Sequence, residues 1–79
     1  MVTLYRAYGL RVIIFTDDHE QAHVHVFGDG QVKINLIGPD GTPALVWVQG
    51  MKGNDVRRAL QIVHDQQAAF LARWKEIHG

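Results

Sequence analysis

The sequence contains no cysteine, which excludes disulfide bonds and zinc sites built on thiolates. It also has no apolar run long enough to span a bilayer, and Arg6 and Arg11 interrupt the segment where a signal peptide would be apolar. We therefore expect a soluble cytoplasmic protein of bacterial type, with no membrane partner.

An excess of charge of either sign is absent as well. Eight basic and eight acidic residues cancel, and a neutral chain has no strong long-range attraction for nucleic acid or anionic membranes. The 79 residues predict a single domain, 1–79, with a small hydrophobic core. Small domains often gain stability from a metal or a second chain. Here a metal would need histidine and carboxylate ligands.

Residues 1–50 read as a sheet and residues 54–78 as a helix. Runs rich in β-branched and aromatic residues predict strands at 10–16, 23–28, 31–37 and 43–49, with 2–8 as a weaker candidate for an extra edge strand. Beyond "GMKGN", with Asn54 as the N-cap, apolar residues recur at helical spacing, interrupted at Gln67. The predicted fold class is α+β: a small antiparallel β-meander of three to four strands, with one long C-terminal α-helix packed on one face.

Three of the five histidines, His19, His23 and His25, lie within seven residues in "DDHEQAHVHVFGDGQ". His23 and His25 point to the same face of their strand, because side chains alternate along a strand. The loop of the following hairpin decides which face this is. A two-residue loop, Asp29-Gly30, would place the histidines among apolar side chains.

A three-residue loop, 28–30, instead places His25 opposite Lys33 and His23 opposite Asn35, with Gly30 in the left-handed conformation. We favour this register, because burying a histidine without a partner costs about 1–3 kcal/mol per unsatisfied group. The candidate functional face is then the one away from the helix. A four-residue "GPDG" loop would add Val46 and Val48 to this face.

Two kinds of chemistry fit these residues. His23 and His25, two apart on a strand, are able to bind one divalent metal such as zinc, with His19 or Asp18 completing the ligand set. Without a metal, two histidines beside Lys33 suit general acid–base cleavage of a phosphodiester such as RNA, with the lysine stabilising the phosphorane. The alternative without a functional site is an exposed polar face on which the histidines have no specific role.

A partner interface is the third hypothesis. Ile13, Phe15 and Trp47 cannot all face one helix, which leaves apolar surface on the other side of the sheet. We therefore expect the chain either to bind a second small protein or to form a homo-oligomer. A fourth alternative is a pH-responsive or scaffold module, since histidine titrates near neutrality.

The segment "YGLRVIIFTDDHEQAHVHV", residues 8–26, resembles the start of a small bacterial domain family of unknown function, number four thousand one hundred and sixty. Its pattern reads approximately Asp-His-x-Pro-Pro-His-Phe-His-Val, after a glycine and a strand. The matching residues here are Gly9, Asp18, His19, His23, His25 and Val26. Gln21 and Ala22 stand in place of the prolines, and Val24 in place of the phenylalanine. Members have been grouped with toxin–antitoxin-like pairs, so the resemblance implies a small protein partner.

Our leading prediction is a protein-binding module that forms one component of a toxin–antitoxin-like pair. The alternative is a histidine-dependent hydrolase or ribonuclease, with or without a metal.

Overall fold

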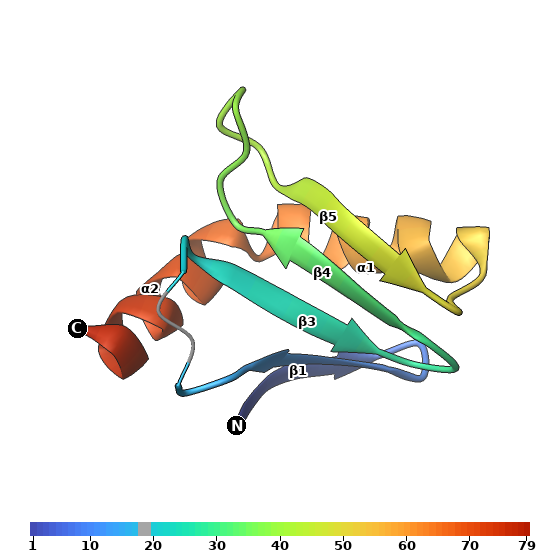
Figure 1. Cartoon of the computed structure of the whole chain (residues 1–79), viewed down its shortest axis with the longest axis horizontal. Coiled ribbons are helices and arrows are strands. Elements are labelled where there is room, and N and C mark those ends of the chain that lie inside the picture. The colour runs from blue at the N-terminus through green and yellow to red at the C-terminus, as the bar shows by residue number, and fades with distance from the viewer. Residues whose placement is uncertain (18–19) are drawn as a thin grey trace.

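A computed structural model of the chain describes residues 1–17 and 20–79. Within these ranges it contains five strands followed by two helices (Figure 1). They are β1 (Val2–Ala7), β2 (Leu10–Ile14), β3 (His23–Phe27), β4 (Gln31–Asn35), β5 (Ala44–Gln49), α1 (Gly53–Asp65) and α2 (Gln67–His78). The α+β class is confirmed, whereas the predicted three to four strands and single long helix are wrong. The additional strand is β1, whose residues pair with β2 along its whole length.

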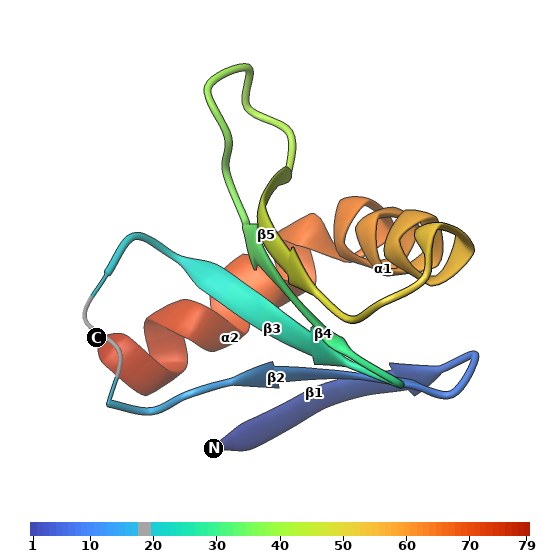
Figure 2. The same ribbon diagram turned by 45° about the vertical axis from the view of Figure 1, so that its right-hand side comes forward.

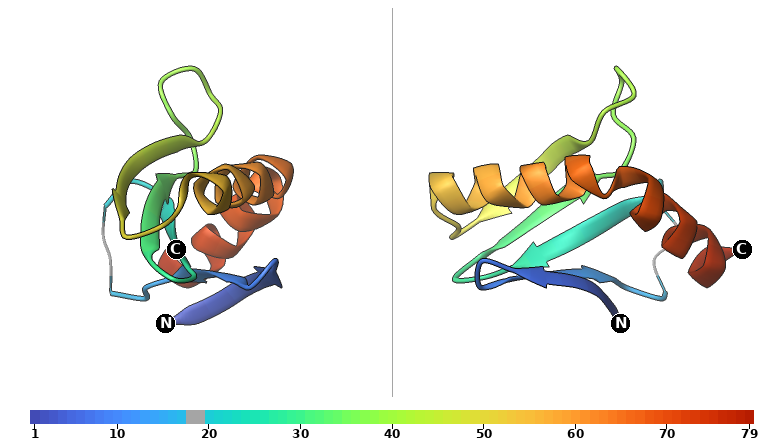
Figure 3. Two further views of the ribbon diagram at one scale, coloured as in Figure 1. Left: turned by 90° about the vertical axis from the view of Figure 1, so that its right-hand side faces the viewer. Right: turned by 180° about the vertical axis from the view of Figure 1, so that it is seen from behind.

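The sheet is a meander in the order β1-β2-β3-β4-β5, and each strand is antiparallel to its neighbours. β3 is therefore the central strand, and β1 and β5 are the two edges. Seen along the sheet in Figure 3 (left), the strands curve around the helices, which both lie on one face. Figure 2 shows the β4–β5 loop projecting beyond the body of the sheet.

The hydrophobic core fills the space between the sheet and the helices. Alternate residues of β2, β3 and β4 point into it because strand side chains alternate between faces. The helices contribute residues at helical spacing. The main members are Leu10, Val12, Ile14, Val24, Val26, Val32, Ile34, Leu36, Ala59, Ile62, Val63, Phe70 and Trp74. Ile13 is also fully buried, although its neighbours Val12 and Ile14 point to the opposite face, so the middle of the sheet is covered on both sides.

The predicted helix is broken at Gln66, whose backbone leaves the helical conformation at φ −107° and ψ 15°. The next residue, Gln67, explains how the bend is fixed. Its Nε2 donates hydrogen bonds to the carbonyl oxygens of Leu36 at 2.7 Å and Gly41 at 2.9 Å, which ties the start of α2 to the β4–β5 loop. The change of direction lets the second helix follow the curved sheet, as Figure 3 (right) shows.

The first helix also begins earlier than predicted. Its N-cap is Lys52, not Asn54, and no side chain caps it. Asp55 still lies in the first turn, where a carboxylate interacts favourably with the helix dipole. None of the helices in residues 1–17 and 20–79 is long and apolar enough to cross a membrane.

Candidate functional site

The hairpin between β3 and β4 has the predicted register. His23 lies opposite Asn35 and His25 opposite Lys33, and Phe27 pairs with Gln31, so that three residues form the loop. The predicted left-handed conformation of Gly30 is wrong, because its φ is not positive. Glycine is needed at this position because there is no room for a side chain: a Cβ would lie 2.3 Å from the backbone carbon of Gly50. Gly30 therefore allows the start of β4 to approach the end of β5.

The two histidines of β3 are buried, although the face that carries them lies away from the helices. The exposed fraction is 1% for His23 and 8% for His25. The expectation of an open polar face was wrong because it equated the side without a helix with the solvent. Rings from neighbouring segments cover this part of the sheet instead, and the imidazoles sit within it.

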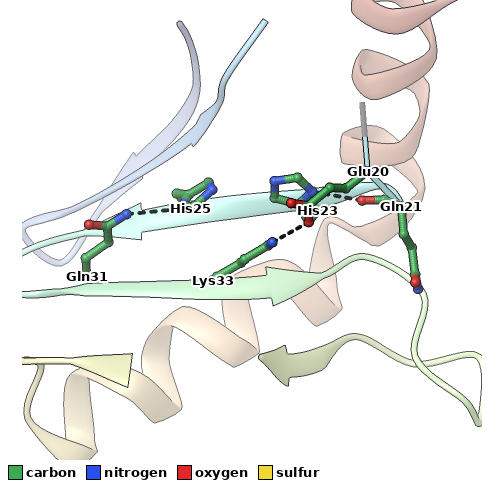
Figure 4. A network of polar contacts seen from close by, with 6 residues as sticks. All are labelled: Glu20, Gln21, His23, His25, Gln31 and Lys33. Atoms are coloured by element: carbon green, nitrogen blue, oxygen red, sulfur yellow. Dashed lines mark hydrogen bonds and ion pairs between the residues drawn. The ribbon is translucent and has the colours of Figure 1, made fainter. Parts of the chain in front are cut away.

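Each histidine ring has a hydrogen-bonding neighbour (Figure 4). Nδ1 of His23 lies 2.8 Å from the carbonyl oxygen of Gln21, and a carbonyl only accepts, so this nitrogen carries a proton. For His25 the direction is reversed, since Nε2 of Gln31 donates to its Nδ1 at 3.0 Å. A neutral His25 therefore carries its proton on Nε2, whereas a neutral His23 carries it on Nδ1. The two imidazoles differ in tautomer although they are two residues apart.

Lys33 completes the polar part of the site on the adjacent strand. Its Nζ lies 2.5 Å from a carboxylate oxygen of Glu20, in the connection between β2 and β3. Figure 4 shows this pair beside His23, with Gln31 at the other end of the network. Glu20 and Gln31 were absent from the predicted site. Gln31 stands two residues before Lys33 on the same face, a spacing that the sequence could have revealed.

Aromatic rings join the two histidines into a larger cluster. The ring of Phe15 meets His25 edge-on at 4.7 Å between centroids, and Trp47 of β5 lies 5.8 Å from the same imidazole. The rings of His23 and His25 are 5.2 Å apart. We call the rings of Phe15, His23, His25, Trp47, Trp74 and His78 the histidine–aromatic cluster.

The cluster extends from the sheet to the end of the second helix. Trp74 lies 5.2 Å from the ring of His23, and His78 stacks on Trp74 at 3.8 Å. The Nε2 atom of His78 is buried and has no hydrogen-bond partner among the described residues. Three histidines from β3 and α2 thus share one set of contacting rings, and His78 was not among the predicted site residues.

Of the four predicted metal ligands, the structure describes His23 and His25. Asp18 and His19 lie outside the described residues. Among residues 1–17 and 20–79, no three His, Asp or Glu side chains gather closely enough to hold a metal ion. His23 does have the orientation common in metal ligands, with one ring nitrogen donating to a backbone carbonyl.

The edge strand β5 differs from the prediction. Lys33 lies opposite Trp47, Val32 opposite Val48 and Ile34 opposite Leu45, with a register shift that leaves Val46 as an extra residue. The predicted placement of Val48 beside the histidines is therefore wrong, because Val48 lies opposite Val32 on the helix face, and Trp47 lies opposite Lys33 instead. Val46, as the extra residue, has no partner in this register. A β-bulge of this kind inserts one residue and so reverses the alternation beyond it.

Four consecutive apolar residues of β5 are exposed: Leu45 42%, Val46 45%, Trp47 37% and Val48 43%. Leu45 and Val48 are on the same face as the helices, and their exposure means that α1 covers this edge only in part. The strand contains no charged residue. An uncharged, apolar edge strand is an unusual feature, because edge strands in soluble proteins are commonly protected by charge, proline or a covering element.

These observations define a small α+β domain whose central strand carries a buried histidine pair and whose last strand is an exposed apolar edge. Residues 9–75 match the family model described as "Domain of unknown function (DUF4160)", and the chain belongs to this family. No curated protein and no solved structure matches the chain.

Proposed function

We propose that this chain is a protein-binding module that works in a complex with a second small protein, as one component of a toxin–antitoxin-like pair. The observation that carries the proposal is the exposed apolar edge strand β5, Ala44–Gln49. Its outer backbone groups are available to pair with an added strand, and its side chains are apolar on both faces. Recognition by β-strand addition uses both features.

The chemistry of β5 indicates what kind of partner fits it. Because the strand has no charged residue, the partner segment must be extended and largely apolar, without buried charges that lack a counter-ion. Trp47 stands near the middle of the strand, and tryptophan is among the residues most enriched at interaction hot spots. Its ring also contacts His25, which links the edge to the histidine–aromatic cluster.

The test is native mass spectrometry of the protein co-expressed with the product of its neighbouring gene. A heteromeric complex that is lost in Val46→Lys supports the proposal, since a lysine on the edge blocks strand addition. Tyr8→Lys is the matched control, because it places the same charge on an exposed residue in the β1–β2 turn, at the opposite edge of the sheet. A chain that stays monomeric at micromolar concentration, with the product of the neighbouring gene present, would contradict the proposal. A homodimer would contradict it too, and would show that the partner is a second copy of this chain.

A second candidate function is a histidine-dependent hydrolase or ribonuclease. Its support is the pair of imidazoles with opposite tautomers, which suits one general base and one general acid. Lys33 beside them is a cation able to stabilise a developing negative charge. The burial of both rings weighs against it, and two surface hollows of about 390 and 250 Å³ lie along α1 without including either ring.

A divalent metal such as zinc, held by His23 and His25 together with His19 and Asp18, would belong to this second candidate. Its test is RNA cleavage and growth inhibition by the double variant His23→Gln, His25→Gln. Loss of activity in a variant that stays folded by circular dichroism supports catalysis. Activity that survives both changes would exclude His23 and His25 from the mechanism, whether or not the protein binds a metal.

A further inference from the structure

The strand register aligns side chains from all five strands in two rows on the face away from the helices. In one row Thr3 pairs with Ile13, Ile13 with His25, His25 with Lys33 and Lys33 with Trp47. Ile13 and His25 are buried, so this row is closed in the middle of the sheet.

The other row reaches solvent along its length, with its two ends exposed and its middle half-buried. Arg6 pairs with Arg11, Arg11 with Phe27, Phe27 with Gln31, and Gln31 with Gln49. None of these five residues is buried. We call them the open row.

The charges of the sheet are of one sign. The five strands contain Arg6, Arg11 and Lys33 and no aspartate or glutamate. The overall neutrality of the chain therefore conceals a separation, because every carboxylate among the described residues lies in a helix, a turn or a loop. Glu20 neutralises Lys33, so the positive charge left on this face is that of Arg6 and Arg11, which attracts anions even though the net charge is zero.

Arg6 and Arg11 face each other directly across the first two strands. Like charges directly opposite on a sheet repel and destabilise the pairing. The ion pairs between described residues join Lys33 to Glu20, His64 to Asp65 and Arg73 to Glu76, and none of them involves either arginine of the open row. A phosphate bound between two guanidinium groups would convert this repulsion into two charge-assisted contacts.

The rest of the open row has the chemistry of a base-binding surface. The guanidinium of Arg11 lies over the ring of Phe27, 6.0 Å from its centroid, and bases stack on both aromatic rings and guanidinium planes. Beyond Phe27 the amides of Gln31, whose Nε2 also donates to Nδ1 of His25, and Gln49 continue the row. Amides donate and accept hydrogen bonds, which matches base edges and the 2′-hydroxyl of ribose.

We propose that the open row binds single-stranded RNA. Arg6 and Arg11 hold a backbone phosphate, and Phe27 stacks with the adjacent base. Gln31 and Gln49 contact the base edges and 2′-hydroxyls that follow. This activity is separate from the proposed protein partner, because it uses the face of the sheet and not the outer edge of β5.

The test is fluorescence anisotropy with a short labelled oligouridylate over a range of salt concentrations. Arg6→Gln with Arg11→Gln is expected to weaken binding by roughly 10- to 100-fold at low salt and to lower the slope of log K against log salt by about 0.7, the loss of the one phosphate that the two arginines hold. Phe27→Leu keeps both charges and is expected to weaken binding by roughly tenfold through lost stacking.

The matched control is Arg57→Gln with Lys75→Gln, which removes the same charge from exposed positions on the two helices. It is expected to keep the affinity within about threefold, since distant charges are largely screened. Circular dichroism checks that each variant is folded. The proposal is overturned by the absence of binding to the unaltered protein, by equal losses in both double variants, or by tighter binding of single-stranded DNA or duplex RNA of matching length.

Discussion

The central strand β3 and the edge strand β5 reverse the usual relation between polarity and burial. β3 carries two histidines that are almost fully buried, whereas β5 carries four apolar residues that are between 37% and 45% exposed. Rings from Phe15, Trp47 and Trp74 lie against the histidines of β3. The strand β5 has no neighbouring strand on its outer side, and its apolar side chains stay exposed.

The two strands also differ in whether other groups of the chain compensate for their unusual side chains. The imidazoles of β3 bond to a backbone carbonyl and a glutamine amide, so their burial does not leave those polar atoms without a partner. The apolar side chains of β5 have no comparable compensation within the described part of the chain. The free energy available from covering them, about 25 cal/mol per Å² of apolar surface, supports the protein-binding proposal.

The largest predicted effect concerns the contact that joins the β3–β4 turn to the end of β5. Gly30→Ala would place a Cβ 2.3–2.5 Å from the backbone of Gln49 and Gly50, which has to move. We expect a loss of unfolding free energy on the order of 3 kcal/mol or more, measured by urea denaturation.

The control for this change is Gly53→Ala at the start of α1. A Cβ there would meet only Arg57 Nη1, at 3.9 Å, and alanine favours a helix over glycine. The control is expected to be neutral or stabilising. A tolerated Gly30→Ala would mean that the end of β5 is not held against the turn.

The contrast between the strands is tested most directly by one substitution made in each. Val24→Ala removes a fully buried side chain of β3 from the core and is expected to cost about 2 kcal/mol. Val46→Ala removes the same atoms from β5 and is expected to change stability by less than about 0.5 kcal/mol. Chemical denaturation of both variants gives the two values. Equal losses would show that β5 is buried in solution, by a second copy of the chain.

The next effect is smaller and of opposite sign. Arg6→Gln removes one of two like charges that face each other across β1 and β2, so stability should rise by about 0.2–1 kcal/mol. Arg73→Gln is the control, because it breaks the exposed pair with Glu76 at 2.6 Å and should lower stability by at most about 1 kcal/mol. Thermal melts at low salt measure both. A destabilised Arg6→Gln would remove the repulsion on which the RNA proposal partly rests.

Much of the fold could be predicted because it depends on local signals. The "GDG" turn and the alternation on either side of it were enough to give the register of β3 and β4. The bend at Gln66 was not predictable from the apolar spacing alone. Gln67 interrupts that spacing, but its role depends on the carbonyls of Leu36 and Gly41, which only the folded chain brings close.

The candidate site was harder to predict than the fold. Register shows which side chains share a face, and it placed His23, His25 and Lys33 together. It does not show what lies above them. Phe15 contacts His25 from just beyond the neighbouring strand β2, and Trp74 contacts His23 from the second helix, so burial of the pair depends on contacts that the register of β3 and β4 does not give. The single extra residue in β5 likewise places Trp47, and not Val48, on the face of the histidines.

The smallest predicted effect lies in the β4–β5 loop that leads into the edge strand. The hydroxyl and backbone N–H of Thr42 both donate to the carboxylate of Asp40, at 2.7 and 3.1 Å, and these bonds hold the pKa of Asp40 below its ordinary value. A group whose pKa is lower in the folded state stabilises that state at neutral pH and ceases to do so as the pH falls below about 4. Thr42→Val removes the hydroxyl donor but keeps the N–H, so the pKa of Asp40 should rise toward its ordinary value, as measured by NMR titration. Because the carboxylate is exposed, the fold itself should survive the change, and an unaltered titration in the variant would show that the loop does not hold Asp40 through this hydroxyl.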